Sequence, residues 1–449
     1  MHSAKLTMAK ILIVLFVACG LQMSANAQEN SPYSRYGIGD LTPNHNIFTR
    51  GMAGISAAVI DYQSINFTNP ASLATINKTI FDVAVDVNTR TLKSTVPAKK
   101  FSSVNTYISY LQIGFPLTTA KMRKKDMLWG MSFGLRPVSK INYKIESNER
   151  LTGIDSLKTL YEGTGGVTQA YIGTALKIKN FSIGFNAGYM FGSKNYSRIR
   201  TFINDTTSYY MSRSSNNTSF GGLFVSGGLQ YDIVLEKDYM GRLIRNLRVG
   251  LYGNIQKNLN ASSDNVRETI FYDATGNIAR IDSVYDQKDV KGSITFPAIV
   301  GFGFSYQNTN WMYGADIEYG NWGGYRYYGQ ADQVQNNWLI RAGAQYIPVK
   351  ENAATVKYFN YVKYRAGLYY GTDYINVNSS RPQYGFTLGT GMPLSSLKRI
   401  SYTNEYVVLN TALEIANRGN KQTNLRENIV RFSIGVSMSA SWFQKPKYH

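Results

Sequence analysis

Apolar and polar residues alternate along most of the chain, from about residue 80 almost to its end. In the segment 181–191, FSIGFNAGYMF, apolar side chains occupy every second position, and small or polar residues fill most of the others. The segments 128–136 and 430–442 repeat this pattern. A period of two residues predicts β-strands with one apolar face and one small or polar face. Segments of about ten residues also match the length of a tilted strand that spans a membrane.

Fourteen segments of this kind follow one another, and we predict a strand for each. They lie at approximately 80–88, 106–115, 128–136, 170–178, 181–191, 223–233, 247–256, 294–306, 311–319, 338–346, 362–370, 384–392, 405–415 and 430–442. The tracts 138–146 and 266–285 alternate as well. We interpret both tracts as strand extensions or hairpins within long connections.

The connections between these segments, numbered in chain order, are longer on average at odd numbers than at even numbers. The odd-numbered connections hold 13 to 37 residues, whereas the even-numbered ones hold 2 to 15. Short turns on one side and long loops on the other are typical of an outer-membrane β-barrel, whose short turns face the periplasm. The alternative is a large soluble β protein, which has no reason to sort its loops by parity. We therefore predict an all-β fold, a transmembrane antiparallel β-barrel of about 14 strands, with both chain ends in the periplasm.

Aromatic residues fall at the ends of the predicted strands, where a membrane barrel carries its interfacial girdles. They are Tyr306, Trp311, Tyr319, Trp338, Tyr346, Tyr364 and Tyr384. Aromatic residues at strand ends would also suit the core of a soluble protein. The alternation and the loop parity favour the barrel.

The first 27 residues have the pattern of a secretory signal peptide. A short basic region precedes an apolar run at 11–21, and the sequence ANA at 25–27 matches a signal peptidase site, so cleavage is expected after Ala27. The apolar run is shorter than the roughly 20 residues of a membrane helix. Lipoprotein processing at Cys19 is an alternative, although Phe16 is a poor residue three positions before such a cysteine. Both alternatives predict an exported protein, which we place in the outer membrane.

The composition excludes several kinds of chemistry. Cys19 lies within the predicted signal and is the only cysteine, and His45 is the only histidine apart from residue 2 and the last residue. These counts argue against a disulfide, a thiolate or histidine metal site and a Ser-His-Asp triad in the mature chain. We predict that the protein is not an enzyme and binds no metal or cofactor. We expect His45 to lie in a solvated loop, and Asp316 and Glu318 to line the lumen.

The chain is strongly basic, with a formal net charge of +20. In an exported protein, the anionic partners are lipid headgroups and lipopolysaccharide phosphates. The basic residues are scattered among turns and strand ends, whereas nucleic-acid binding requires a basic stripe with interleaved aromatic residues. We therefore predict contacts with outer-membrane lipid and lipopolysaccharide, and no nucleic-acid partner.

Residues 28–79 do not belong to the strand series. The stretch 47–76 is rich in small residues, which favours a short helix or a close-packed coil. A barrel of about 14 strands has a lumen too wide for its own side chains to fill, so we predict that this segment plugs it as a hatch. Near its end, Pro70 lacks an N–H and favours extended geometry at Asn69, which predicts a turn into the first strand.

The predicted organisation has four parts. They are a signal peptide at 1–27, an N-terminal periplasmic segment and hatch at 28–79, the barrel at 80–443 and a periplasmic tail at 444–449.

The stretch RGMAGISAAVIDYQSINFTNPASLATI (50–76) resembles the hatch region of the FadL/TodX family of outer-membrane transporters of hydrophobic compounds. The matching positions are Gly51, Ala53, Gly54, Ala57, Asp61, Asn69, Pro70, Ala71 and Leu73. Of these, the resemblance implies a hatch or gating role for Gly51, Ala53, Gly54, Asp61, Asn69, Pro70 and Ala71. The opening SPYSRYGIGDL and the ending LRENIVRFSIGVSMSASWF are similar to a Bacteroidota branch of this superfamily.

The resemblance implies a monomeric channel for passive uptake of hydrophobic small molecules such as long-chain fatty acids. The ligand would bind in an extracellular groove, cross past the hatch and leave through a gap in the barrel wall. An acyl chain gains roughly 0.8 kcal/mol per buried CH₂, so binding needs no catalysis. The long connections at 204–219 and 262–289 are polar and carry no long apolar helix. They favour the alternative, an accessory subunit of a type IX secretion or outer-membrane assembly complex with protein partners and no transport role.

Overall fold

The computed structural model describes residues 31–95, 98–150, 156–203, 209–238, 243–348, 357–377, 379–394, 405–419 and 425–440. The predicted signal peptide and the tail at 444–449 lie outside these residues. The described strands form one antiparallel sheet that closes on itself, because β18 pairs with β2. Each of the fourteen predicted segments overlaps one strand of the resulting 14-stranded wall, so the predicted all-β barrel is confirmed.

The strands of the wall have the following bounds. They are β2 (Thr79–Thr95), β3 (Ala98–Pro116), β4 (Met127–Glu149), β5 (Leu157–Ile178), β6 (Phe181–Phe202), β7 (Met211–Lys237), β8 (Leu243–Asn254), β11 (Ile299–Gln307), β12 (Trp311–Gly320), β14 (Asn337–Tyr346), β15 (Lys363–Val377), β16 (Ser379–Pro393), β17 (Val407–Arg418) and β18 (Leu425–Ala440).

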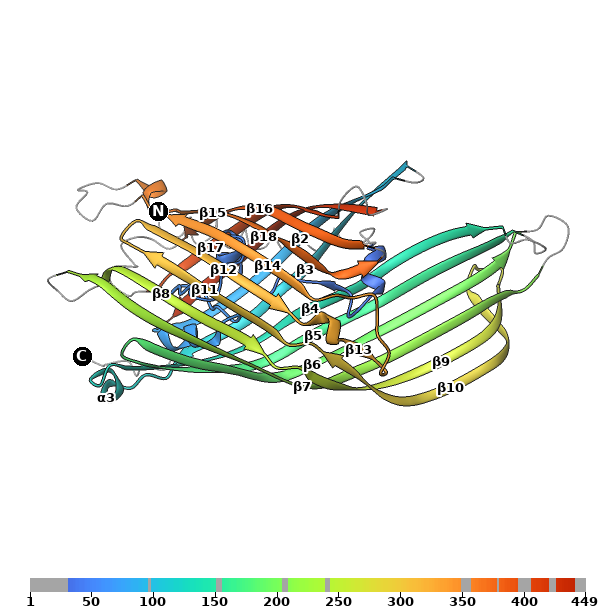
Figure 1. The fold of residues 1–449 in the computed structure, drawn as a ribbon, viewed down its shortest axis with the longest axis horizontal. Coiled ribbons are helices and arrows are strands. Elements are labelled where there is room, and N and C mark those ends of the chain that lie inside the picture. The colour runs from blue at the N-terminus through green and yellow to red at the C-terminus, as the bar shows by residue number, and fades with distance from the viewer. Residues whose placement is uncertain are drawn as a thin grey trace, which may run out of the picture.

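The barrel is much taller on one side than on the other. Strands β9 (Lys257–Tyr272) and β10 (Ile278–Phe296) continue β8 and β11, and β9 pairs with the first half of β7. Figure 1 shows β4 to β7, together with β9 and β10, reaching far beyond the remaining strands. The tract 138–146 lies within β4, and the tract 266–285 spans the β9–β10 hairpin with its turn at 273–277, as predicted.

The long polar connections are largely strands and not irregular loops. In the tract 204–219, for example, β7 already begins at Met211. There Asn216 donates its side-chain amide to Asn265 of β9, and the Thr218 hydroxyl donates to Ser263. Polar side chains can therefore continue a sheet beyond the barrel when they bond to those of the next strand.

Strand β4 is only partly joined to β3. The two strands pair from Leu111 to Pro116 on β3, opposite residues 130–135 of β4, and no further. We call the unpaired interval beyond Leu111 and Leu135 the β3–β4 seam. Figure 1 shows the β2–β3 and β4–β5 hairpins diverging from one another.

Part of the chain before β2 lies in this seam. The 3₁₀ helix η2 (Pro32–Arg35) and strand β1 (Asp40–Leu41) lie along β4, with Asp40 opposite Lys140. The Ser31 N–H donates to the Asn142 carbonyl over 3.1 Å. Backbone bonds from this stretch therefore replace some of those that β3 does not make.

The rest of this stretch packs between opposite walls. Helix α2 (Ile47–Arg50) contacts β16, β17 and β18, whereas η3 (Pro70–Thr75) contacts β4 to β7. Every residue of both elements is buried. We call the described residues 31–78 the N-terminal segment. Short elements occupy the other connections: α3 (Ala120–Arg123), η4 (Trp322–Gly324), β13 (Arg326–Tyr327) and η5 (Tyr358–Asn360).

The two faces of the wall differ as the alternation predicts. Large apolar side chains on the outer face are exposed, among them Phe133, Ile172, Phe185 and Leu223. Glycine, serine and charged residues occupy the intervening inward positions. Within the described ranges, no helix has the length and apolar character needed to cross a bilayer.

Candidate functional site inside the barrel

The predicted hatch residues lie in the N-terminal segment and contact different walls. Gly51 follows helix α2 and approaches Gly389 of β16. Ala53 has a φ of 58° and donates its N–H to the Thr387 hydroxyl over 2.8 Å. Gly54, with a φ of 84°, completes this turn against the ring of His45. These residues therefore form one tight turn against β16.

The remaining predicted residues contact other strands. Asp61 pairs with Lys363 of β15 over 3.4 Å. Asn69 accepts the Ala71 N–H over 3.1 Å, as the N-cap of η3, and donates to the Ala57 carbonyl over 2.5 Å. Pro70 lies against Gly184 of β6. The structure therefore brings these residues together in two groups, one at β15–β16 and one at β6–β7.

Inward-facing glycines of the wall make this packing possible. A side chain at Gly228 would collide with Asn69, one at Gly130 with the Leu73 carbonyl and one at Gly250 with the Ala57 carbonyl. Glycine allows this close approach because it has no Cβ. The alternation identified these positions as small, but it could not show which segment occupies the space.

His45 is buried, at 6% exposure, so its predicted place in a solvated loop is wrong. Its Nδ1 lies 3.1 Å from the Ser56 hydroxyl and 3.4 Å from that of Thr68. The surrounding N-terminal segment fills the lumen and covers the ring, which sequence alone could not show. Asp316 and Glu318 do lie inside, where the Asp316 carboxylate accepts the N–H groups of Ser56 and Ala57. Across the described ranges, no cluster of three His, Cys, Asp or Glu residues could hold a metal.

Six charges, five of them buried and Arg418 largely so, form a closed ring at the level of β1. The ring alternates in sign and runs Asp40, Arg90, Glu427, Arg381, Asp373, Arg418 and back to Asp40. Its ion pairs include Arg381–Glu427 at 3.1 Å and Arg418–Asp40 at 2.6 Å. We call this the charge ring.

Asp40 is the one member of the charge ring that comes from the N-terminal segment. Burial alone would raise the pKa of its carboxyl, but Arg90 and Arg418 lower that pKa below the usual value. Ser31 adds a hydrogen bond to Glu427 over 3.2 Å, and Tyr33 lies 3.4 Å from the Arg381 guanidinium. The charge ring therefore ties the part of the segment that lies in the seam to five wall strands.

Arg50 ties the segment to the point where β3 leaves β4. Its Nη1 donates to both carboxylate oxygens of Asp86 over 2.7 Å, and its Nη2 donates to Ser109 over 2.7 Å. Ser109 is an extra residue on β3, between the pairs that Ile108 and Tyr110 make with β2. Such a bulge bends its strand, so Arg50 contacts the bend at the base of the seam.

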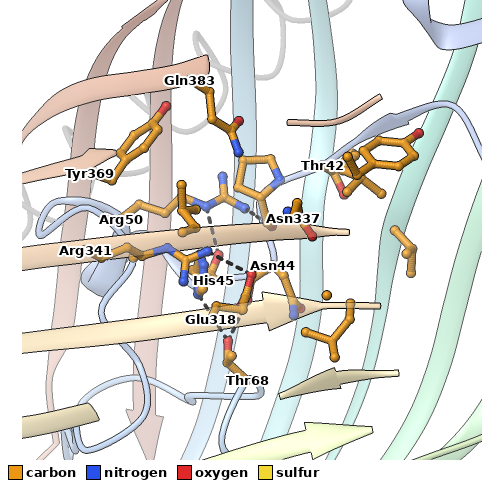
Figure 2. A pocket seen from close by; sticks show the side chains of 18 of the residues that line it. Thr42, Asn44, His45, Arg50, Thr68, Glu318, Asn337, Arg341, Tyr369 and Gln383 are labelled. Carbon is orange, nitrogen blue, oxygen red and sulfur yellow. Dashed lines mark hydrogen bonds and ion pairs between the residues drawn. The ribbon is translucent and has the colours of Figure 1, made fainter. Parts of the chain in front are cut away.

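A cavity of about 230 Å³ lies between the N-terminal segment and the wall. Figure 2 shows Arg341 and Glu318 of the wall beside His45 and Arg50 of the segment. Arg341 pairs with Glu318 over 3.1 Å, and the Tyr252 hydroxyl donates to Glu318 over 2.6 Å. The charges of Arg341 and Glu318 therefore neutralise one another.

Arg136 is the exception among the arginines of this cavity. It donates to the side-chain oxygens of Asn44 and Gln169, the latter over 2.7 Å, and lies 4.8 Å above the Phe67 ring. In the part of the chain that the structure describes, no carboxylate pairs with it. Met190 and Phe224 supply apolar surface to the same cavity. The cavity thus offers an unneutralised cation beside aromatic and aliphatic walls, which suits a ligand with an anionic head and an apolar body.

The geometry defines a closed, antiparallel 14-stranded β-barrel with an N-terminal segment packed inside it. The BamG family model matches residues 8–449, and the chain belongs to the BamG family. No curated protein matches the chain.

Three solved structures share the fold. The CymD monoaromatic hydrocarbon channel is 15% identical over 91% of this chain and 100% of its own, with a TM-score of 0.52. A Pseudomonas aeruginosa FadL homologue is 13% identical over 90% of this chain and 100% of its own, with a TM-score of 0.54. The Pseudomonas putida toluene transporter TodX is 15% identical over 90% of this chain and 100% of its own, with a TM-score of 0.51. These structural matches confirm the predicted FadL/TodX-type fold, and at such low identities they show the fold alone. The similarity to a Bacteroidota branch stays a prediction.

Proposed function

We propose that the protein is an outer-membrane channel for the passive uptake of hydrophobic small molecules, with long-chain fatty acids as its substrate class. The observation that carries this proposal is the cavity beside the N-terminal segment, where Arg136 lacks a carboxylate partner. Arg136 is half-buried and has only neutral acceptors. A charge removed from water without a counter-charge is costly, and a bound carboxylate would neutralise it. The solved structures with this fold include a hydrocarbon channel and a toluene transporter, which supports a hydrophobic substrate.

The proposed route uses the seam and the hatch. A ligand would occupy the cavity with its head at Arg136 and its chain against Phe67, Met190 and Phe224. Arg136 directly follows the last β4 residue that pairs with β3, so the head site lies at the base of the seam. The N-terminal segment acts as the hatch, and the two groups of predicted residues, from Gly51 to Asp61 and from Asn69 to Ala71, hold it against opposite walls.

The test measures binding of a radiolabelled C16 fatty acid to the purified protein in detergent. Arg136→Gln should weaken binding about tenfold to a hundredfold, because a hydrogen bond to a charged group contributes about 1.5–3 kcal/mol. Arg245→Gln is the matched control, since Arg245 is exposed and pairs with Glu236, and it should bind normally. Hexadecane should bind equally to all three proteins. Absence of any hydrophobic ligand from the natively purified protein, together with no binding, would refute the channel.

The second candidate function is an accessory subunit of an outer-membrane secretion or assembly complex. It is favoured by the filled interior, where buried ion pairs hold the N-terminal segment on several sides. The outer edge of β10 between Ile278 and Gly292 is also unpaired within the described sheet, so it offers backbone groups to a partner. Purification in mild detergent with identification of copurifying proteins tests this alternative, and recovery of the barrel alone would contradict it.

A further inference from the structure

The outer surface of the wall carries a second hollow, of about 530 Å³. We call it the outer hollow. Its walls are Trp311, Tyr346 and Tyr364 on one side and Leu388 and Phe432 on another. Tyr364, Leu388 and Phe432 are 40%, 46% and 42% exposed, so these side chains point away from the lumen. The hollow therefore opens toward the lipid and not toward the cavity described above.

The strand register creates the outer hollow. Ala344 of β14 lies opposite Ala366 of β15, one row away from the paired aromatic residues Tyr346 and Tyr364. Side chains two residues apart share a face of the sheet, so two small residues here border two large ones. The alanine pair forms the floor, and the aromatic pair forms a raised wall beside it.

The aromatic wall is held in place by further contacts. The ring of Trp311 stacks on Tyr313 at 5.4 Å between centroids, and it lies 4.4 Å from Tyr346. The row of Tyr364 continues onto β16 and β17, where the hydroxyls of Thr390 and Thr411 hydrogen-bond to each other over 2.8 Å. The rings therefore resist collapse into the hollow, and the hydroxyls already satisfy one another, which leaves a mainly apolar site.

The size and position of the hollow decide what occupies it. Only 12 residues line it, whereas a stable protein interface takes about 20–30 residues on each side. It lies beside Trp311, directly after the short turn at 308–310, within the outward apolar face. A flexible hydrocarbon chain can fill such a hollow and remain continuous with the bilayer.

We propose that the outer hollow binds one acyl chain of a membrane phospholipid. The inference rests on the outer-membrane placement within the proposed function, but not on transport. Phe432 of β18 is the lining residue nearest to the seam, and β2 and β3 lie between them. A lipid held here would therefore neither fill the cavity at Arg136 nor obstruct the seam.

The experiment counts phospholipids on the full-length protein by native mass spectrometry after purification from the membrane in mild detergent. Ala366→Phe fills the floor of the hollow. Ala187→Phe is the matched control, because Ala187 is an exposed, outward-facing alanine of β6, far from the hollow. We expect one retained phospholipid on the unmodified barrel and on Ala187→Phe, and at least tenfold lower occupancy on Ala366→Phe.

Equal phospholipid occupancy in the two variants would overturn the inference, as would a hollow that retains only detergent or a copurifying protein. Heat-modifiable migration in electrophoresis shows that each variant is folded, and the milder variant Ala366→Leu repeats the test if Ala366→Phe is not. Fatty-acid binding is measured on the same samples. Suppose that Ala366→Phe loses its phospholipid while none of the samples binds fatty acid. The inference about the outer hollow would then stand, and only the proposed function would be refuted.

Discussion

Strand β4 has two very different neighbours. On one side it pairs with β5 along its entire length, from Met127 to Glu149. On the other side it pairs with β3 over six residues, and β1 adds two more. The first contact is a continuous backbone ladder, whereas the second is a seam that the N-terminal segment partly closes.

The comparison shows where the barrel can open. Parting β4 from β5 would break a long series of backbone hydrogen bonds together. Parting the segment from β4 breaks few backbone bonds, and the charge ring and Arg50 supply much of what holds the segment there. Side chains therefore control the seam, and single substitutions should change it.

The largest expected effect is on stability, from Glu427→Ala in the charge ring. Glu427 is fully buried and bonds to Arg90, Arg381 and Ser31. Within the charge ring, its removal leaves Arg90 with Asp40 alone and Arg381 with Asp373 alone, and three largely buried guanidinium groups then face only two carboxylates. The uncompensated buried charge should cost about 3–5 kcal/mol in the free energy of unfolding. The midpoint of urea unfolding in detergent measures this loss of stability. Glu162→Gln breaks an ion pair with Lys144 on the β4–β5 side, and this control should change stability by at most about 1 kcal/mol.

A smaller loss of stability is expected from Gly228→Ala. The added methyl group would collide with Asn69, and overpacking of this kind costs about 1–3 kcal/mol. The adjacent Gly227→Ala is the control, because the nearest atom to its Cβ, the Gly184 carbonyl oxygen, lies 3.9 Å away. Equal urea midpoints for the two variants would show that the N-terminal segment does not occupy this position.

Cross-linking tests whether the seam opens during uptake. Lys140 of β4 lies over the Tyr107 ring of β3, with its Nζ 3.4 Å from the ring centroid. Tyr107→Cys with Lys140→Cys, joined by a short reducible thiol cross-linker, should reduce uptake of labelled fatty acid at least tenfold, and reduction should restore it. The predicted mature chain has no other cysteine.

The matched pair spans the continuous side of β4. Lys144→Cys with Glu162→Cys joins two residues that already face one another across β4 and β5. Cross-linking there should leave uptake unchanged. A similar loss in both pairs would mean that general rigidity, and not the seam, limits transport.

The smallest effect is expected from Asn69→Ala. Loss of the N-cap bond to the Ala71 N–H should cost about 1 kcal/mol. Asn260→Ala, at an exposed position on β9, should stay within about 0.5 kcal/mol of the unmodified protein. Both values come from the same urea titrations. Asn69 also donates to the carbonyls of Leu229 and Leu251 in the wall. A loss well above that of Gly228→Ala would mean that these bonds, and not the cap, dominate.

The strands could be predicted because their pattern is local. The segment 181–191 shows its two faces without reference to any other strand, and β6 begins at Phe181 as predicted. The predicted loops were less accurate, because Ser, Thr and Asn extend a strand only when a partner strand is present. In β7, Asn216 and Thr218 find such partners on β9.

The candidate site could be predicted only in part. The small residues near Gly51 and Gly54 marked a segment that packs closely, and Asn69 and Pro70 marked its turn. Their partners, such as Gly228 and Thr387, were not identified because sequence distance says nothing about which wall a segment meets. For the same reason His45 was expected in solvent.

The sequence by itself determined the class of fold, since alternation with a period of two sets the two faces of every strand wherever that strand lies. The tertiary structure decided what those faces meet. Asp40 and Arg418 form an ion pair although they are 378 positions apart in the sequence, and Ala344 and Ala366 form a floor only through the β14–β15 register. Ion pairs, the seam and the outer hollow all depend on register and closure, which are properties of strand pairs and of the whole barrel.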